Sequence, residues 1–69
     1  MRINEMQKDF LNITEVVELT TLSRPVIYRQ IKKGLFPKPF EFEGIGRRVV
    51  WSVMEINEWM LSNLKRKSA

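Results

Sequence analysis

The placement of proline and glycine constrains the fold of this chain more than any other feature of the sequence. Pro25 comes two residues after Ser23, and proline is tolerated in the first turn of a helix, where its missing amide hydrogen costs nothing. Ser23 is therefore a predicted N-cap. Gly34 is a suitable helix end, because glycine readily adopts the left-handed C′ conformation. We predict a helix that runs to about Lys33.

A shorter helix is predicted just before this one. Thr14 is its expected N-cap, because a threonine hydroxyl can accept a hydrogen bond from a first-turn amide. Glu15 suits the positive end of the helix dipole. The helix is expected to run from Glu15 to Leu19 or Thr20, and a tight turn then leads to Ser23. Two helices joined by such a turn have the shape of a helix-turn-helix.

The segment after Gly34 is predicted to be extended and then to form a β-hairpin. Two prolines in "LFPKPF" exclude a helix, and each biases the preceding residue toward β or polyproline geometry. The stretches "EFE", "GIG" and "RRVVW" have the alternation, turn glycines and β-prone residues of a hairpin. Phe40 and Phe42 alternate with charged residues, so we expect them in the core of this hairpin.

A last helix is predicted from Val53 to about Leu64. Ser52 and Glu55 match the S-x-x-E capping box that opens many helices. At helical spacing the apolar side chains of this segment lie on or near one face. They are Ile56, Trp59, Met60 and Leu64. Trp51 and Trp59 are expected in the core rather than as base-stacking platforms, because a domain of 69 residues needs large side chains to fill it.

The predicted fold is mostly helical with a small β-hairpin, in a single domain with winged helix-turn-helix architecture. Residues 10–64 are expected to form this domain, with a flexible leader at 1–9 and a basic flexible tail at 65–69. The chain contains neither Cys nor His, which removes the usual general base and metal ligands. We therefore predict no enzymatic activity, no cofactor and no metal site. The N-terminal residues lack the apolar run of a signal peptide, and no segment approaches membrane-span length, so we expect a cytoplasmic protein.

The charge distribution indicates a function for the second helix. The chain has 12 basic and 8 acidic residues, a balance that favours acidic partners such as nucleic acid. At about 100° per residue, Ile27 and Ile31 point one way. Three basic side chains collect on the opposite side, where a recognition helix would face a major groove, and Arg24 lies on the flank between the two sides. The three are Arg29, Lys32 and Lys33. Arg47 and Arg48 form a second basic pair just after the hairpin glycines.

Two other interpretations compete with DNA binding. A basic helix face is often only a solvated face. The chain could instead be a protein-interaction module that binds an integrase or a response regulator without DNA. This second alternative rests on the apolar last helix, whose Met54, Leu61 and Leu64 do not all fit one small core.

The stretches "ITEVVELTTLSRPVIYRQIKKGLFPKP" and "VVWSVMEINEWM" resemble the AlpA-type phage regulators. These are small winged-helix proteins related to excisionases and to the DNA-binding head of MerR-type regulators. The resemblance covers Leu11 to Lys65. It implies DNA binding by the second helix and the wing, in the role of a transcription regulator or of a recombination directionality factor. Pro25 departs from the family, which often has a small polar residue there; it could instead contact a thymine methyl.

The helix geometry, the charge pattern and the resemblance together define one candidate site. Its expected partner is double-stranded DNA. The resemblance further implies a phage-type integrase as a partner, and a protein that is monomeric in solution and assembles cooperatively on DNA. Tyr28 could close the edge of the core and still turn its hydroxyl to a phosphate. The predicted DNA-binding residues are Ser23, Arg24, Pro25, Tyr28, Arg29, Lys32, Lys33, Arg47 and Arg48.

Overall fold

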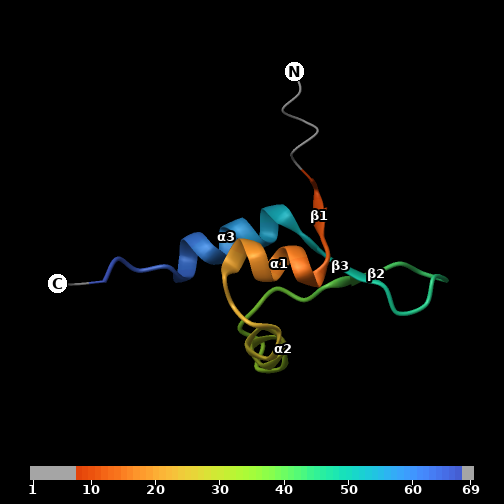
Figure 1. Cartoon of the computed structure of the whole chain (residues 1–69), viewed down its shortest axis with the longest axis horizontal. Coiled ribbons are helices and arrows are strands. Elements are labelled where there is room, and N and C mark those ends of the chain that lie inside the picture. The colour runs from red at the N-terminus through yellow and green to blue at the C-terminus, as the bar shows by residue number, and fades with distance from the viewer. Residues whose placement is uncertain (1–7, 68–69) are drawn as a thin grey trace, which may run out of the picture.

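The computed structural model describes residues 8–67. Within this range the chain forms three helices and three short strands (Figure 1). The predicted class, mostly helical with a small amount of β-structure, is confirmed. Residues 1–7 of the expected leader and residues 68–69 of the expected tail lie outside the described part of the chain. In chain order the elements are β1 (Phe10–Leu11), α1 (Ile13–Thr20), α2 (Arg24–Lys32), β2 (Phe40–Glu41), β3 (Val49–Ser52) and α3 (Val53–Asn63).

Helix α1 starts earlier than the sequence predicted. Its N-cap is Asn12, whose side chain accepts a hydrogen bond from the Glu15 amide at 2.8 Å. The Glu15 carboxylate in turn accepts one from the Asn12 amide at 2.9 Å. This reciprocal capping box satisfies two first-turn amides at once, so Asn12 forms the cap and the expected cap at Thr14 is wrong. The helix ends at Thr20, as predicted, because Thr21 adopts a left-handed conformation with φ of 64°.

Helix α2 has the boundaries that proline and glycine predicted. The Ser23 hydroxyl accepts a hydrogen bond from the Val26 amide at 3.4 Å, and Pro25 lies in the first turn. Lys33 is the C-cap, and Gly34 follows with φ of 76°. Positive φ is strained for residues with a Cβ, and glycine is therefore the residue that lets the chain leave the helix here.

The three strands form one antiparallel sheet in the order β1-β3-β2. Strand β1, which the sequence analysis did not predict, pairs Leu11 with Trp51. Strand β2 pairs Phe40 with Val50, which confirms the hairpin. Strand β3 runs directly into α3, and the Ser52 hydroxyl caps this helix by accepting a hydrogen bond from the Glu55 amide at 3.2 Å.

The expected burial of Phe40 and Phe42 is wrong, since their side chains remain 48% and 43% exposed. Residues directly opposite each other in an antiparallel pair share a face of the sheet. Phe40 lies opposite Val50, whereas the neighbouring Trp51 is the residue of β3 that enters the core. The alternation correctly grouped the phenylalanines on one face, but it is the outer face. There Phe40 makes an edge-to-face contact with Phe10, at 6.4 Å between ring centroids.

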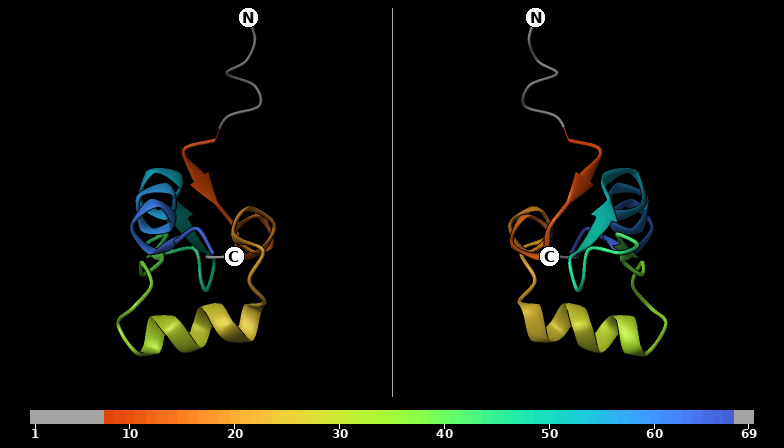
Figure 2. Two further views of the ribbon diagram at one scale, coloured as in Figure 1. Left: turned by 90° about the vertical axis from the view of Figure 1, so that its left-hand side faces the viewer. Right: turned by 90° about the vertical axis from the view of Figure 1, so that its right-hand side faces the viewer.

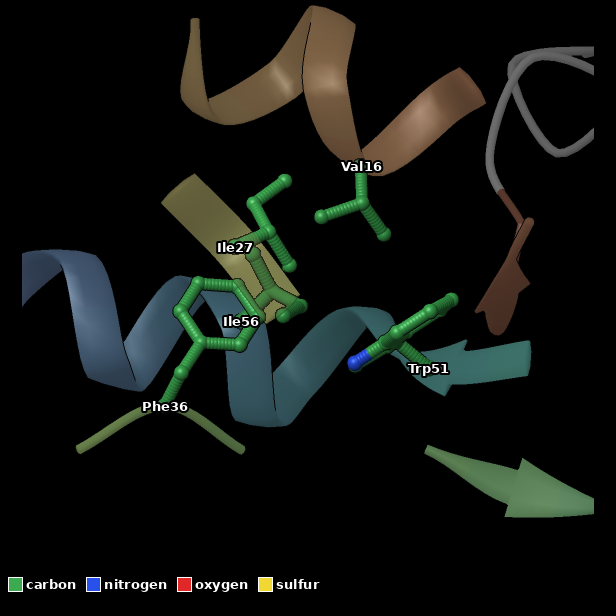
Figure 3. Close-up of a cluster of buried hydrophobic side chains, with 5 residues drawn as sticks. All are labelled: Val16, Ile27, Phe36, Trp51 and Ile56. Carbon is green, nitrogen blue, oxygen red and sulfur yellow. The ribbon is translucent and has the colours of Figure 1, made fainter. Parts of the chain in front are cut away.

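The core is one small cluster to which each helix contributes a buried side chain (Figure 3). Phe36, from the extended segment after α2, closes it on one side. The indole Nε1 of Trp51 donates a hydrogen bond to the Pro37 carbonyl at 3.1 Å, which ties that segment to the core. The prediction that Trp51 fills the core is therefore confirmed. The five buried residues are Val16, Ile27, Phe36, Trp51 and Ile56.

Helix α3 places Ile56 in the core, with Trp59 and Met60 packed partly against it. The Trp59 indole donates to the Leu35 carbonyl at 2.7 Å. Leu64 was expected on the same face but is 71% exposed. It is the C-cap, the position where the helix ends and the backbone becomes extended with ψ of 135°, and it is not among the residues that pack against the core.

Candidate nucleic-acid interface

The predicted recognition residues lie on the exposed side of α2. Ile27 is fully buried and attaches the helix to the core, with Val26 and Ile31 half-buried beside it. Because successive residues are about 100° apart, the side opposite Ile27 faces solvent. Figure 2 shows α2 along one edge of the molecule, with α1 and α3 on its inner side. The exposed residues at this edge are Ser23, Arg24, Pro25, Tyr28, Arg29, Lys32 and Lys33.

This side of α2 is positively charged, and no acidic side chain pairs with its basic residues within the described part of the chain. Residues 24–33 contain four basic residues and no acidic residue. Among residues 8–67 the one ion pair joins Lys8 to Glu15, which is on α1. The basic side chains of α2 are therefore free to neutralise an external anion, such as the phosphates of a nucleic acid.

Arg24 is oriented by a contact that the sequence analysis missed. Its Nη2 donates a hydrogen bond to the Thr14 hydroxyl at 3.0 Å, which links the start of α2 to the first turn of α1. Thr14 is thus a positioning residue for Arg24. The two residues are ten positions apart, and no sequence spacing indicates a contact at that separation. Arg24 has five N–H donors, so most of its hydrogen-bonding capacity remains.

The N-terminus of α2 offers few free backbone donors. The Val26 amide is occupied by the Ser23 hydroxyl, and the Ile27 amide donates to the Ser23 carbonyl at 3.0 Å. Pro25 has no amide hydrogen. At the first three helical positions this leaves the Arg24 amide for an anion, together with the hydroxyl hydrogen of Ser23. Anion contacts at this helix end must therefore come mostly from side chains.

Tyr28 has the mixed environment that the sequence suggested. Its side chain is 47% exposed. Its ring lies 6.5 Å from the ring of Trp51, centroid to centroid, at an interplanar angle of 58°. The inner edge of the ring thus contacts the core, and the rest of the side chain stays accessible from the solvent side of α2.

Arg47 and Arg48 form a separate basic region in the loop between β2 and β3. Gly44 and Gly46 have φ of 80° and 83°, and the amide of Ile45 donates to the Phe42 carbonyl at 3.3 Å. These features turn the chain and leave both arginines exposed. Figure 1 shows the hairpin projecting from the helices to one side of α2. The structure therefore keeps these two arginines apart from the basic side of α2.

Two further features of the described residues concern a membrane-spanning helix and a metal site. No helix within residues 8–67 is long and apolar enough to cross a membrane. The same part of the chain has no group of three or more His, Cys, Asp or Glu side chains placed to hold a metal ion.

Comparison with known proteins assigns the chain to a family. The profile of the family described as prophage CP4-57 regulatory protein (AlpA) matches residues 9–64. The chain belongs to this family of phage regulatory proteins, and the resemblance drawn from its motifs is confirmed. It is also 38% identical over 58 residues to ORF88, an uncharacterized protein of Enterobacteria phage P4. That match covers 84% of this chain and 64% of the relative, so this chain spans less than two thirds of the relative's length.

Proposed function

We propose that this phage-type regulator binds DNA sequence-specifically as a winged helix-turn-helix protein. In this proposal α1 and α2 form the helix-turn-helix, and α2 enters the major groove. The hairpin of β2 and β3 is the wing, which contacts the backbone or the minor groove through Arg47 and Arg48. The observation that carries the proposal is the exposed side of α2, with four basic residues, no acid and a buried Ile27 behind it.

The residues of α2 divide into two proposed roles. Arg29 lies opposite Ile27, near the middle of the exposed side, where a guanidinium could bind guanine O6 and N7 together. Lys32 and Lys33 lie in the last turn and are proposed to bind phosphates, which position the helix without reading sequence. Arg24 and Ser23 are proposed to hold a phosphate at the start of the helix.

The proposal includes two biological roles that require the same surface. One is transcriptional regulation of prophage genes, and the other is a directionality factor that helps an integrase excise the element. A footprint on the DNA that flanks the gene and on the nearest attachment site separates them. Protection of several spaced repeats at the attachment site indicates the directionality factor, and protection confined to a promoter indicates the transcription regulator.

The same DNA binding should weaken strongly with salt. Each neutralised phosphate adds about 0.9 to the negative slope of log K against log salt concentration. Five to seven basic contacts, roughly the number that α2 and the loop offer, predict a slope of about −4.5 to −6.3. Gel shifts at several salt concentrations measure this slope. A slope near zero, or no protected site with a folded protein, would contradict the proposal.

A further inference from the structure

The side of the molecule away from α2 contains an open groove of about 1100 Å³. Residues 8–11, α1, the end of β3 and α3 line it, and α2 contributes none. In both views of Figure 2, β1 lies between α1 and α3, while α2 crosses on the opposite side. A ligand in this groove would therefore not compete with DNA bound along α2.

Several large apolar side chains in the groove remain exposed and do not pack into the core. Met54 and Leu61 of α3 are 69% and 80% exposed, and Phe10 of β1 is 52% exposed. Leu19 of α1 faces them from the other wall and is 40% exposed. Side chains of this size, gathered in one hollow, are typical of a surface that binds another protein.

The rim of the groove is acidic. Four carboxylates and one basic residue line it. The basic residue is Lys8, which is already paired with Glu15. The sum is four negative charges and one positive, or −3, on the side opposite the basic face of α2. Such a rim repels DNA and attracts a cationic segment. The four carboxylates belong to Asp9, Glu15, Glu18 and Glu58.

We propose that this groove binds a basic amphipathic helix of a partner protein. A third helix can pack into the space beside two helices and insert apolar side chains one turn apart, at i, i+3 or i+4 and i+7. Leu19, Met54 and Leu61 would receive these side chains, and lysines or arginines on the flanks would meet Glu18 and Glu58. A symmetric pair of copies fits less well, because an isologous contact would place acidic rim against acidic rim.

A pair of synthetic peptides tests the proposal in the absence of DNA. Both are about four helical turns long with leucine at i, i+3 and i+7, and they differ in carrying lysine and arginine or glutamate elsewhere. We expect the basic peptide to bind the full chain in fluorescence anisotropy, and the acidic peptide to bind at least tenfold more weakly. In a two-dimensional amide NMR titration, the shifted signals should belong to β1, α1 and α3.

Matched variants locate the site. The double substitution Glu18→Lys with Glu58→Lys should lower the affinity for the basic peptide at least tenfold. The double substitution Glu41→Lys with Glu43→Lys makes the same change in charge at exposed positions outside the groove lining and should leave affinity within twofold. Leu61→Ser should weaken binding tenfold, whereas Leu64→Ser, equally apolar and exposed but outside the groove lining, should not.

Three outcomes would overturn the proposal. The first is no binding of the basic peptide up to about 1 mM. The second is equal binding by the variant with Glu18→Lys and Glu58→Lys and by the control with Glu41→Lys and Glu43→Lys. The third is a dimer, seen by sedimentation, that Leu61→Ser abolishes, because it would assign the groove to a second copy. None of these results depends on DNA binding, so the two proposals fail separately.

Discussion

At the scale of single residues, the role of a side chain depends on which neighbours occupy its hydrogen-bonding groups. Thr14 was expected to cap α1, but its hydroxyl accepts from Arg24 while Asn12 caps the helix. Asn12 and Glu15 could have been chosen from the sequence, because Asn is as good a cap as Thr and Glu three residues later completes the box. The contact of Thr14 with Arg24 could not have been predicted from the sequence, because it forms only when α1 and α2 pack together.

Arg29→Ala tests the proposed base contact. We expect a loss of about 1–3 kcal/mol in binding free energy at the specific site and a smaller loss on random DNA, since a guanine contact is available only at the correct sequence. Arg66→Ala is the matched control, because it removes the same charge from the exposed segment after α3. Gel-shift titrations of the parent chain and both variants on the two DNAs give the four losses of binding free energy. Equal losses on the two DNAs would make Arg29 a phosphate contact.

The Glu15 carboxylate should make the stability of the fold depend on pH. The hydrogen bond from Lys8 and then that from the Asn12 amide lower the pKa of the Glu15 carboxyl below its ordinary value. A group with a lowered folded pKa contributes stability that is present above the unfolded pKa and is lost as pH falls through the folded pKa. Urea unfolding between about pH 6 and pH 3 should therefore show a smaller loss of stability for Glu15→Gln than for the parent chain.

The matched substitution Asn12→Ala separates the cap from the charge. It removes the cap acceptor and should cost about 1 kcal/mol at neutral pH. Identical pH profiles for the parent chain and Glu15→Gln would show that the lowered pKa has no effect on stability.

At the scale of elements, backbone conformation at the helix ends decides where each helix begins and stops. Pro25 and Gly34 defined α2 from the sequence because each has a conformational preference that few other residues share. Thr21 is the opposite case, a β-branched residue with φ of 64° at the end of α1. Such a residue rarely adopts this conformation, and no sequence rule would place it there.

Substitutions at the left-handed residues that follow α1 and α2, Thr21 and Gly34, should have opposite effects. Thr21→Gly removes strain and should raise the free energy of unfolding by about 0.5–1 kcal/mol. Gly34→Ala introduces strain at φ of 76° and should lower it by about 1 kcal/mol, although a Cβ there meets no atom within 4 Å. Urea denaturation of both variants measures the difference. A destabilised Thr21→Gly would mean that the bond from the Thr21 hydroxyl to the Thr20 carbonyl outweighs the strain.

At the scale of the whole molecule, two indole hydrogen bonds attach the proline segment to the rest of the fold. Trp51 is fully buried and donates to Pro37, whereas Trp59 is only partly buried and donates to Leu35. The segment holds Phe36 in the core, so both bonds help to close a domain of 69 residues. Aromatic content predicted that the tryptophans belong to the core, but their polar partners depend on the course of the chain.

Trp51→Phe should therefore destabilise the fold more than Trp59→Phe. The first leaves a cavity and a partly buried Pro37 carbonyl without its donor, at a cost of about 1–3 kcal/mol. After the second, water can reach the Leu35 carbonyl, because Leu35 is 58% exposed, and the loss should be under 1 kcal/mol. Chemical denaturation of the two variants provides the comparison. Equal losses would show that the partly buried bond of Trp51 contributes no more than the exposed bond of Trp59.

The sequence by itself determined the helices, their approximate ends, the hairpin and the basic side of α2. These properties follow from local conformational preference and from periodicity, which act between residues close in the chain. The tertiary structure alone decided which face of the hairpin is covered, that β1 joins the sheet, and that Thr14 holds Arg24. It also brought Phe10, Leu19, Met54 and Leu61 into one groove. These outcomes depend on contacts between residues far apart in sequence, and the packing of a single small core selects among them.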